Sequence, residues 1–137
     1  MAAVIADTGP LVAFFDRGER HHRWAADRID SLEPPLLVCE PVLAETMYLL
    51  GRFPRAQHLL FGLLEKGALK LAFHVGDHVA ALRALHEKYR DRPMSLADAC
   101  IVRMAEIYDG CAVLTLDSDF SVYRKHTRVP LTLISPE

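Results

Sequence analysis

Ala3-Val4-Ile5-Ala6-Asp7-Thr8-Gly9-Pro10 is the stretch of sequence that decides the fold of this chain. The first four residues are an apolar run of the length of a short buried strand, and the next four end it. Because proline is tolerated in the first turn of a helix, we expect a helix from Pro10 to about Phe15. A buried strand followed directly by a helix is typical of an α/β chain.

The same alternation continues along the chain. We expect further strands at 36–38, 69–72, 112–116 and 131–134, and further helices at 21–32, 41–50, 54–66, 77–89, 95–108 and 120–125. Strands that are apolar throughout and alternate with helices indicate a parallel sheet covered on both faces. In such sheets the ligand site lies beyond the carboxyl ends of the strands, so polar side chains there are the first candidates for chemistry.

Length and composition favour one soluble domain spanning residues 1–137, with 51% hydrophobic and 25% charged residues. No apolar run approaches the roughly 20 residues that cross a bilayer. The segment from Met1 to Ala6 lacks the basic head of a signal peptide. We therefore expect a cytoplasmic protein without a membrane anchor. The odd number of cysteines (Cys39, Cys100 and Cys111) favours buried free thiols in a reducing compartment.

The net charge of −2 is unusual for a protein that holds nucleic acid by charge alone. Either the chain does not bind nucleic acid, or its acids gather in a metal site with arginines around it. Planar arginine suits phosphate, although each arginine taken alone is more simply a solvated surface residue. The candidates are Arg17, Arg20, Arg23, Arg28, Arg52, Arg55, Arg124 and Arg128.

Two carboxylates follow predicted strands directly. Asp7 follows the first strand and Asp117 follows the strand at 112–116, so both should lie at the carboxyl edge of the sheet. Asp119 is two residues further on and is either a helix cap or another acid near the site. Asp7 could equally well be the N-cap residue of the following helix.

Two more carboxylates lie on predicted helices. Glu45 shares a helix face with Val42 and Leu49, although an acid near a helix N-terminus is also favoured by the helix dipole. Asp98 completes a capping box with Ser95 and heads a stripe of residues that a helix buries: Ile101, Val102 and Ala105. A carboxylate aligned with a buried stripe must be paired or bound to a cation, because an isolated buried charge costs several kcal/mol.

Four acids in one place would repel one another unless a cation neutralised them. An all-oxygen ligand set suits Mg²⁺ or Mn²⁺ rather than zinc. Such a cation can activate water and stabilise the charge that builds on a phosphodiester during in-line attack. The residues therefore predict a metal-dependent phosphodiester hydrolase.

The four acidic segments together resemble the PIN-domain nucleases, in particular the VapC-type toxins of toxin–antitoxin pairs, over essentially the whole chain. The similar segments are Val4-Ile5-Ala6-Asp7-Thr8, Val42-Leu43-Ala44-Glu45, Ser95-Leu96-Ala97-Asp98-Ala99 and Leu114-Thr115-Leu116-Asp117-Ser118-Asp119-Phe120. Each motif is short, but all four occur in the family's order.

The resemblance implies a PIN-like α/β domain with a central parallel sheet of about five strands, the first strand in the middle, flanked by helices. It implies an endoribonuclease with Mg²⁺, or Mn²⁺, held by Asp7, Asp98, Glu45 and Asp117. Thr8 and Thr115 would orient carboxylates or bound water, with Asp119 nearby. It also implies a homodimer and a cognate antitoxin. The chain departs from many members in having Gly9 where they carry serine, which removes a hydroxyl from the site.

Other classes of protein fit less well. A phospho-receiver domain would need an acidic pair near the first strand and a lysine after a late strand, where this chain has Asp117. A haloacid-dehalogenase-type phosphatase would need an aspartate where Gly9 stands. The remaining alternative is a catalytically silent PIN-like module that holds a structural cation or a partner peptide.

Overall fold

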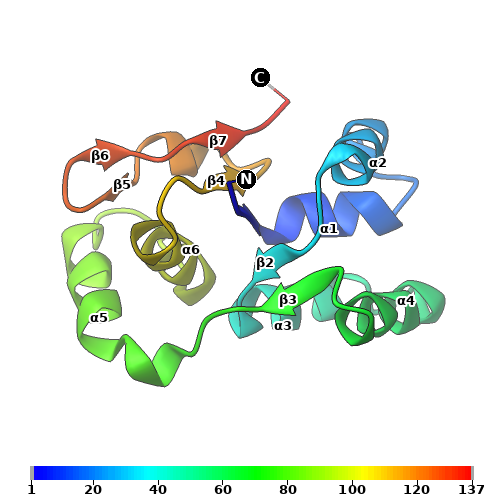
Figure 1. The fold of residues 1–137 in the computed structure, drawn as a ribbon, viewed down its shortest axis with the longest axis horizontal. Coiled ribbons are helices and arrows are strands. Elements are labelled where there is room, and N and C mark those ends of the chain that lie inside the picture. Colours follow the sequence, from blue (N-terminus) through cyan, green and yellow to red (C-terminus); the bar gives the residue numbers. More distant parts are fainter. Residues whose placement is uncertain (1, 137) are drawn as a thin grey trace.

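A five-stranded parallel sheet forms the centre of the computed structural model, which describes residues 2–136. Its strands are β1 (Val4–Ala6), β2 (Leu36–Val38), β3 (Leu69–Leu71), β4 (Ala112–Leu114) and β7 (Leu133–Ile134). They lie in the order β3-β2-β1-β4-β7, so β1 is central (Figure 1). The α/β fold with a central parallel sheet and a middle first strand is confirmed.

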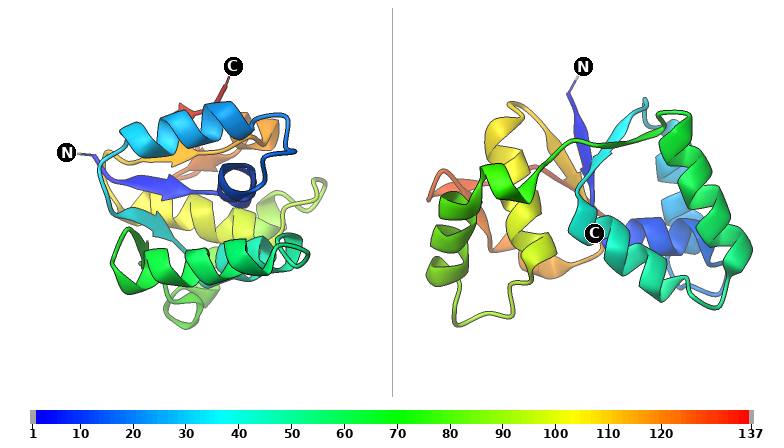
Figure 2. Two further views of the ribbon diagram at one scale, coloured as in Figure 1. Left: turned by 90° about the vertical axis from the view of Figure 1, so that its right-hand side faces the viewer. Right: turned by 90° about the horizontal axis from the view of Figure 1, so that it is seen from below.

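Helices cover both faces of the sheet. They are α1 (Thr8–Phe15), α2 (His22–Ser31), α3 (Glu40–Leu49), α4 (Pro54–Glu65), α5 (Val79–Lys88) and α6 (Leu96–Ile107), with 3₁₀ turns η1 (Val75–Asp77) and η2 (Ser118–Ser121). The right-hand view of Figure 2 shows α5 and α6 on one side of the strands, and α1, α2 and α4 on the other. No helix within residues 2–136 is long and apolar enough to cross a membrane.

The helix boundaries follow from local sequence. Proline lies in the first turn of α3 and of α4, where its missing N–H is not needed. Gly67 and Gly110 adopt φ values of 81° and 71° just beyond the helices that precede them, a conformation that favours glycine. These local signals explain why the helices predicted at 41–50, 54–66 and 95–108 agree with the structure to within one or two residues.

The prediction of a helix at 120–125 is wrong. After η2 the chain forms a short strand β5 (Arg124–Lys125), paired antiparallel with β6 (Val129–Pro130). His126 and Thr127, in the turn between them, have φ values of 49° and 68°. Positive φ at non-glycine residues is uncommon, so neither residue signals the reversal in the sequence. The strand predicted at 131–134 is correspondingly shorter, since β7 begins at Leu133.

The hydrophobic core lies between the sheet and the helices on its two faces. Ile5 and Val113 from adjacent strands are buried in one cluster with Ile101 and Val102 of α6. All three cysteines are buried and unpaired, as predicted. The core therefore holds α6 firmly against β1 and β4, which fixes where its first turn begins.

The packing of three helices defines the carboxyl edge of the sheet. α1 begins directly after β1, and α3 packs against both α1 and α6. Asp7 follows β1 and Asp117 lies three residues beyond the end of β4. Because β1 and β4 are parallel neighbours, these two acids emerge at the same edge of the sheet.

Candidate active site

Asp7 is a buried carboxylate held at both oxygens. Its Oδ1 accepts a hydrogen bond from the backbone N–H of Thr8 at 2.8 Å, and its Oδ2 accepts one from the Thr115 hydroxyl at 2.8 Å. Thr115 is itself fully buried, and its Oγ1 accepts a hydrogen bond from the Asp117 N–H. The end of β4 therefore fixes the orientation of the acid that follows β1.

Asp98 is held at the start of α6 by a capping box. The Asp98 N–H donates to Ser95 Oγ at 3.0 Å, and the Ser95 N–H donates to Asp98 Oδ2 at 3.2 Å. The hydroxyl of Tyr123 donates to the same Oδ2 at 3.3 Å. Asp98 is half-buried, while Ile101, Val102 and Ala105 behind it are buried as the sequence predicts. The capping role and the position on the buried stripe are therefore both present.

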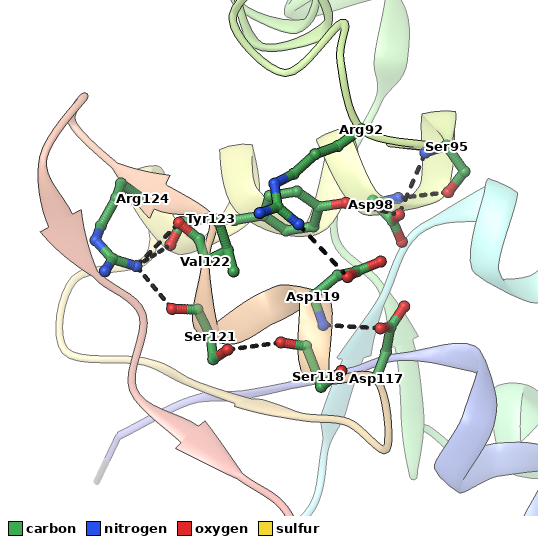
Figure 3. A network of polar contacts seen from close by, with 10 residues as sticks. All are labelled: Arg92, Ser95, Asp98, Asp117, Ser118, Asp119, Ser121, Val122, Tyr123 and Arg124. Atoms are coloured by element: carbon green, nitrogen blue, oxygen red, sulfur yellow. Dashed lines mark hydrogen bonds and ion pairs between the residues drawn. The ribbon is translucent and has the colours of Figure 1, made fainter.

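Asp117 and Asp119 lie at the start of η2, below Asp98 in the view of Figure 3. Asp117 Oδ1 accepts a hydrogen bond from the Asp119 N–H at 2.9 Å, which caps η2. The Asp119 carboxylate faces Arg92 at 3.9 Å. Asp117 lines the same cavity as Asp7 and Asp98, whereas Asp119 does not. The nearest charged partner of Asp119 is thus an arginine rather than the other acids.

Glu45 faces the same open cavity of about 670 Å³ from α3. We call it the acidic cavity, and its lining includes Asp7, Glu45, Asp98 and Asp117 together with Thr8, Gly9 and Ser95. The face that Glu45 shares with Leu49 does not enter the core, since both residues are exposed and line this cavity. The structure thus brings all four predicted acids to one hollow.

Burial dominates the electrostatics of this cavity. It raises the pKa of the Asp7 carboxyl to about 6, with smaller upward contributions from the charges of Asp98 and Asp117. Hydrogen bonds from Thr115 and Thr8 act in the opposite direction. Burial and the charge of Asp117 also raise the pKa of Asp98 above its ordinary value. A site that disfavours its own ionised carboxylates favours any cation that would neutralise them.

The donor chemistry fits a hard divalent cation. Among residues 2–136, no three His, Cys, Asp or Glu side chains are close enough to hold an ion directly between them. Mg²⁺, however, usually binds one or two carboxylates and keeps several waters. Thr8 lines the cavity, and its buried Oγ1 has no hydrogen-bond partner among the described residues. A buried hydroxyl of this kind costs free energy unless it meets a ligand or water.

Three residues that were not predicted from the sequence lie at the cavity or contact an acid that lines it. Tyr123 is fully buried, and burial followed by the negative charges of Asp98 and Asp119 raises its pKa, so its hydroxyl remains a donor. Asp16 and Glu19 also line the cavity, where Asp16 faces Arg52 at 4.0 Å. Asp16 follows α1 immediately, but nothing in its spacing distinguishes it from an ordinary helix end.

Gly9 lies where α1 passes close to Leu116. A Cβ added at Gly9 would lie 3.3 Å from the Leu116 Cβ. Leu116 would have to move by a few tenths of an ångström to accept it. Glycine, which lacks the serine hydroxyl that many members carry at this position, therefore lies in close contact with Leu116 on the cavity wall.

Comparisons with known proteins agree with this architecture. The model of the PIN domain family matches residues 4–126. Ribonuclease VapC26 of Mycobacterium tuberculosis is 34% identical over 116 residues, which cover 83% of this chain and 86% of that protein. The crystal structure of M. tuberculosis VapC20, described as a sarcin-ricin-loop-cleaving toxin, has a TM-score of 0.73 and 21% identity. That likeness covers 88% of this chain and 94% of the other and bears on the fold alone.

Proposed function

Since the chain belongs to the PIN-domain family, we propose that it is a divalent-metal-dependent endoribonuclease, the toxin of a toxin–antitoxin pair. The observation that carries the proposal is the convergence of Asp7, Glu45, Asp98 and Asp117 on one cavity at the carboxyl edge of the sheet. The ribonuclease named among its relatives supports the same class of reaction.

In this proposal Asp7 and Asp98 are the principal metal ligands, and Glu45 and Asp117 complete the pocket. Asp7 is held by Thr8 and Thr115, and Asp98 by Ser95 and Tyr123, so neither carboxylate has to be ordered when the ion binds. As the resemblance implies, Thr8 and Thr115 orient the carboxylates or the bound water, and the hydrogen bonds that both residues donate to Asp7 support this role. When bound, Mg²⁺ or Mn²⁺ supplies a water of lowered pKa and offsets the charge that builds on the phosphodiester.

Two proposed partners of the chain rest on the family and on one surface feature. We propose a cognate antitoxin protein and a homodimer, as the resemblance implies. The helices α3 and α4 expose three large apolar side chains, Tyr48, Leu59 and Phe61, at 83%, 45% and 52%. Large apolar side chains that stay exposed on these helices support a protein-binding role for them.

The test is RNA hydrolysis by the purified chain with Mg²⁺ or Mn²⁺. Cleavage should stop when EDTA is added and should be absent from Asp98→Asn, which keeps the shape of the side chain but removes its charge. Asp77→Asn is the matched control, because Asp77 is exposed and lies outside the acidic cavity. Undiminished cleavage by Asp98→Asn would identify a contaminant. Metal binding without hydrolysis of any RNA would favour the silent binding module instead.

A further inference from the structure

A second hollow adjoins the acidic cavity and shares Leu116 and Asp117 with it. Its own lining comes from three separate segments: the loop before α2 (Arg20 and His21), η2 (Ser118 and Ser121) and the C-terminal segment from β7 onward (Leu133, Ser135 and Pro136). We call it the side groove. Its volume of about 550 Å³ is in the range of pockets that hold small organic groups. A strand that lies across Asp117 would therefore continue into the side groove.

The charges of the two hollows differ. Besides the four predicted acids, the acidic cavity is lined by Asp16 and Glu19, and its one arginine, Arg52, faces Asp16 at 4.0 Å. Arg92, which lines neither hollow, faces Asp119 at 3.9 Å. Among residues 2–136 the side groove is lined by one acid, the shared Asp117, and its Arg20 has no ion pair or hydrogen bond within the same residues. The side groove thus offers, next to the shared Asp117, an arginine that is not neutralised by any described residue.

The hydroxyls of η2 add hydrogen-bonding groups to this charge. Figure 3 shows Ser118 and Ser121 on the same short turn as Asp117. The Ser121 hydroxyl donates to the Ser118 carbonyl at 2.7 Å, which leaves its oxygen as an acceptor. The exposed Ser118 hydroxyl makes no hydrogen bond among the described residues and remains a donor. An arginine and a free hydroxyl on either side of a groove are groups that bind phosphate and sugar oxygens.

The phosphodiester of RNA that is cut must lie among the acids of the acidic cavity. Because both carry negative charge, the phosphodiester binds there only when a cation is bound. Its neighbouring phosphates are repelled by Asp16, Glu19 and Glu45 and attracted by Arg20. We propose that the side groove binds the sugar–phosphate backbone of the RNA strand next to the phosphodiester that is cut, with Arg20 and Ser118 on the flanking phosphate. This inference rests on the proposed function and adds the direction in which the strand leaves the acidic cavity.

The experiment measures binding apart from cleavage. The full chain, with Ca²⁺ in place of Mg²⁺ to slow cleavage, is titrated onto a short fluorescein-labelled single-stranded RNA, and the dissociation constant is followed by anisotropy across a salt series. Arg20→Ala should weaken binding about tenfold at 0.1 M salt, the usual worth of one charge-assisted contact. It should also make the salt dependence shallower by about 0.7 in log–log slope, the value for one phosphate on a single strand.

Arg23→Ala is the matched control, because Arg23 is an exposed arginine at the start of α2 that lines neither hollow. It should change the dissociation constant by less than about twofold, as expected for a diffuse surface charge. Equal losses for Arg20→Ala and Arg23→Ala, or no loss for Arg20→Ala, would overturn the inference. Ser118→Asp, which places a negative charge in the groove without deleting a packed side chain, should weaken binding at least as much as Arg20→Ala.

A second arm uses the active chain. Arg20→Ala should raise KM for RNA while kcat stays within about twofold, because a flanking contact contributes equally to the ground and transition states. A fall in kcat at unchanged KM would contradict a binding role. If the chain cleaves no RNA at all, the proposed function fails, and the binding arm still decides whether the side groove holds RNA.

Discussion

Asp7 illustrates at the scale of one residue how a functional group costs stability. Its side chain is 7% exposed, and its pKa rises from 3.8 to about 6. The folded protein therefore binds this proton more tightly than the unfolded chain does. In the absence of metal, stability falls as pH rises from about 4 to 6, and above that range the ionised Asp7 costs about 3 kcal/mol. A buried carboxylate that costs stability is expected where the residue serves function rather than stability.

Asp7→Asn should stabilise the metal-free protein at neutral pH. The amide removes the buried charge but loses part of the hydrogen bonding to Thr8 and Thr115, so we expect a net gain of about 1–2 kcal/mol at pH 7.5. At pH 4, where Asp7 is protonated, the gain should vanish. Urea unfolding in EDTA at both pH values measures this, with the exposed Asp77→Asn as control. Destabilisation at pH 7.5, or an equal effect at both pH values, would contradict the buried charge.

Tyr123→Phe should impair the reaction without disturbing the core. The ring packs edge-on against Phe120 and Tyr89 with centroids 5.2 and 5.0 Å away, and phenylalanine keeps these contacts. The variant loses the hydrogen bond to Asp98, which lowers the pKa of that carboxyl. We expect kcat to fall about threefold to tenfold. The acid side of the pH–rate profile should also move to higher pH.

Tyr89→Phe is the matched control for Tyr123→Phe. Tyr89 lies in the same aromatic cluster, but its hydroxyl accepts a hydrogen bond from the Arg124 N–H and does not contact Asp98. It should cost stability yet leave the pH–rate profile in place. A shift of the profile in both variants, or in neither, would mean that Tyr123 acts only through packing.

The first turn of α6 joins a structural and a functional role at the scale of one element. Ser95 caps the helix, and the N3 residue of its capping box is Asp98. The cap fixes the backbone of the turn, while the buried stripe behind it fixes the rotation of the helix. Because both features depend on local residue types, this element and its acid could be predicted from the sequence.

Ser95→Ala should lower the free energy of unfolding by about 1 kcal/mol, the usual value for loss of an N-cap hydroxyl. Ser31→Ala is a matched control, because Ser31 ends α2 in an exposed position and donates only to the Arg28 carbonyl. It should change stability by less than about 0.5 kcal/mol. Chemical denaturation of the three proteins in EDTA makes the comparison, and equal losses would argue against the cap.

The elements that the sequence did not predict depend on long-range contacts. The β5–β6 hairpin reverses at His126 and Thr127, whose backbone conformations are uncommon for those residue types. Two side chains from other elements hold the hairpin in place. The His126 N–H donates a hydrogen bond to the Glu106 carboxylate at 2.7 Å, and the Arg124 N–H donates one to the Tyr89 hydroxyl at 2.8 Å. Tyr123 reaches Asp98 through the same segment, so its role could not be predicted from local patterns.

At the scale of the whole molecule, the parallel sheet order is what assembles the site. Asp7, Glu45, Asp98 and Asp117 lie in four different helix or loop segments, and the crossovers bring all of them to the edge where β1 and β4 end. Strand-end positions could be predicted for Asp7 and Asp117 from the alternating pattern. The orientation of Glu45 toward the acidic cavity could not be predicted, because it depends on how α3 packs against α1 and α6.

A divalent cation should stabilise the whole fold by binding the native state alone. Raising Mg²⁺ to about 100 times its dissociation constant should add about 2.7 kcal/mol. That gain corresponds to a Tm increase of roughly 10 °C for a chain of this length. Because Mg²⁺ must displace the proton from Asp7, whose pKa is about 6, the increase should shrink as pH falls below 6. Thermal melts with Mg²⁺, against NaCl at equal ionic strength, separate binding from charge screening. Asp98→Asn should lose most of the increase, and an equal increase in that variant would exclude the acidic cavity as the binding site.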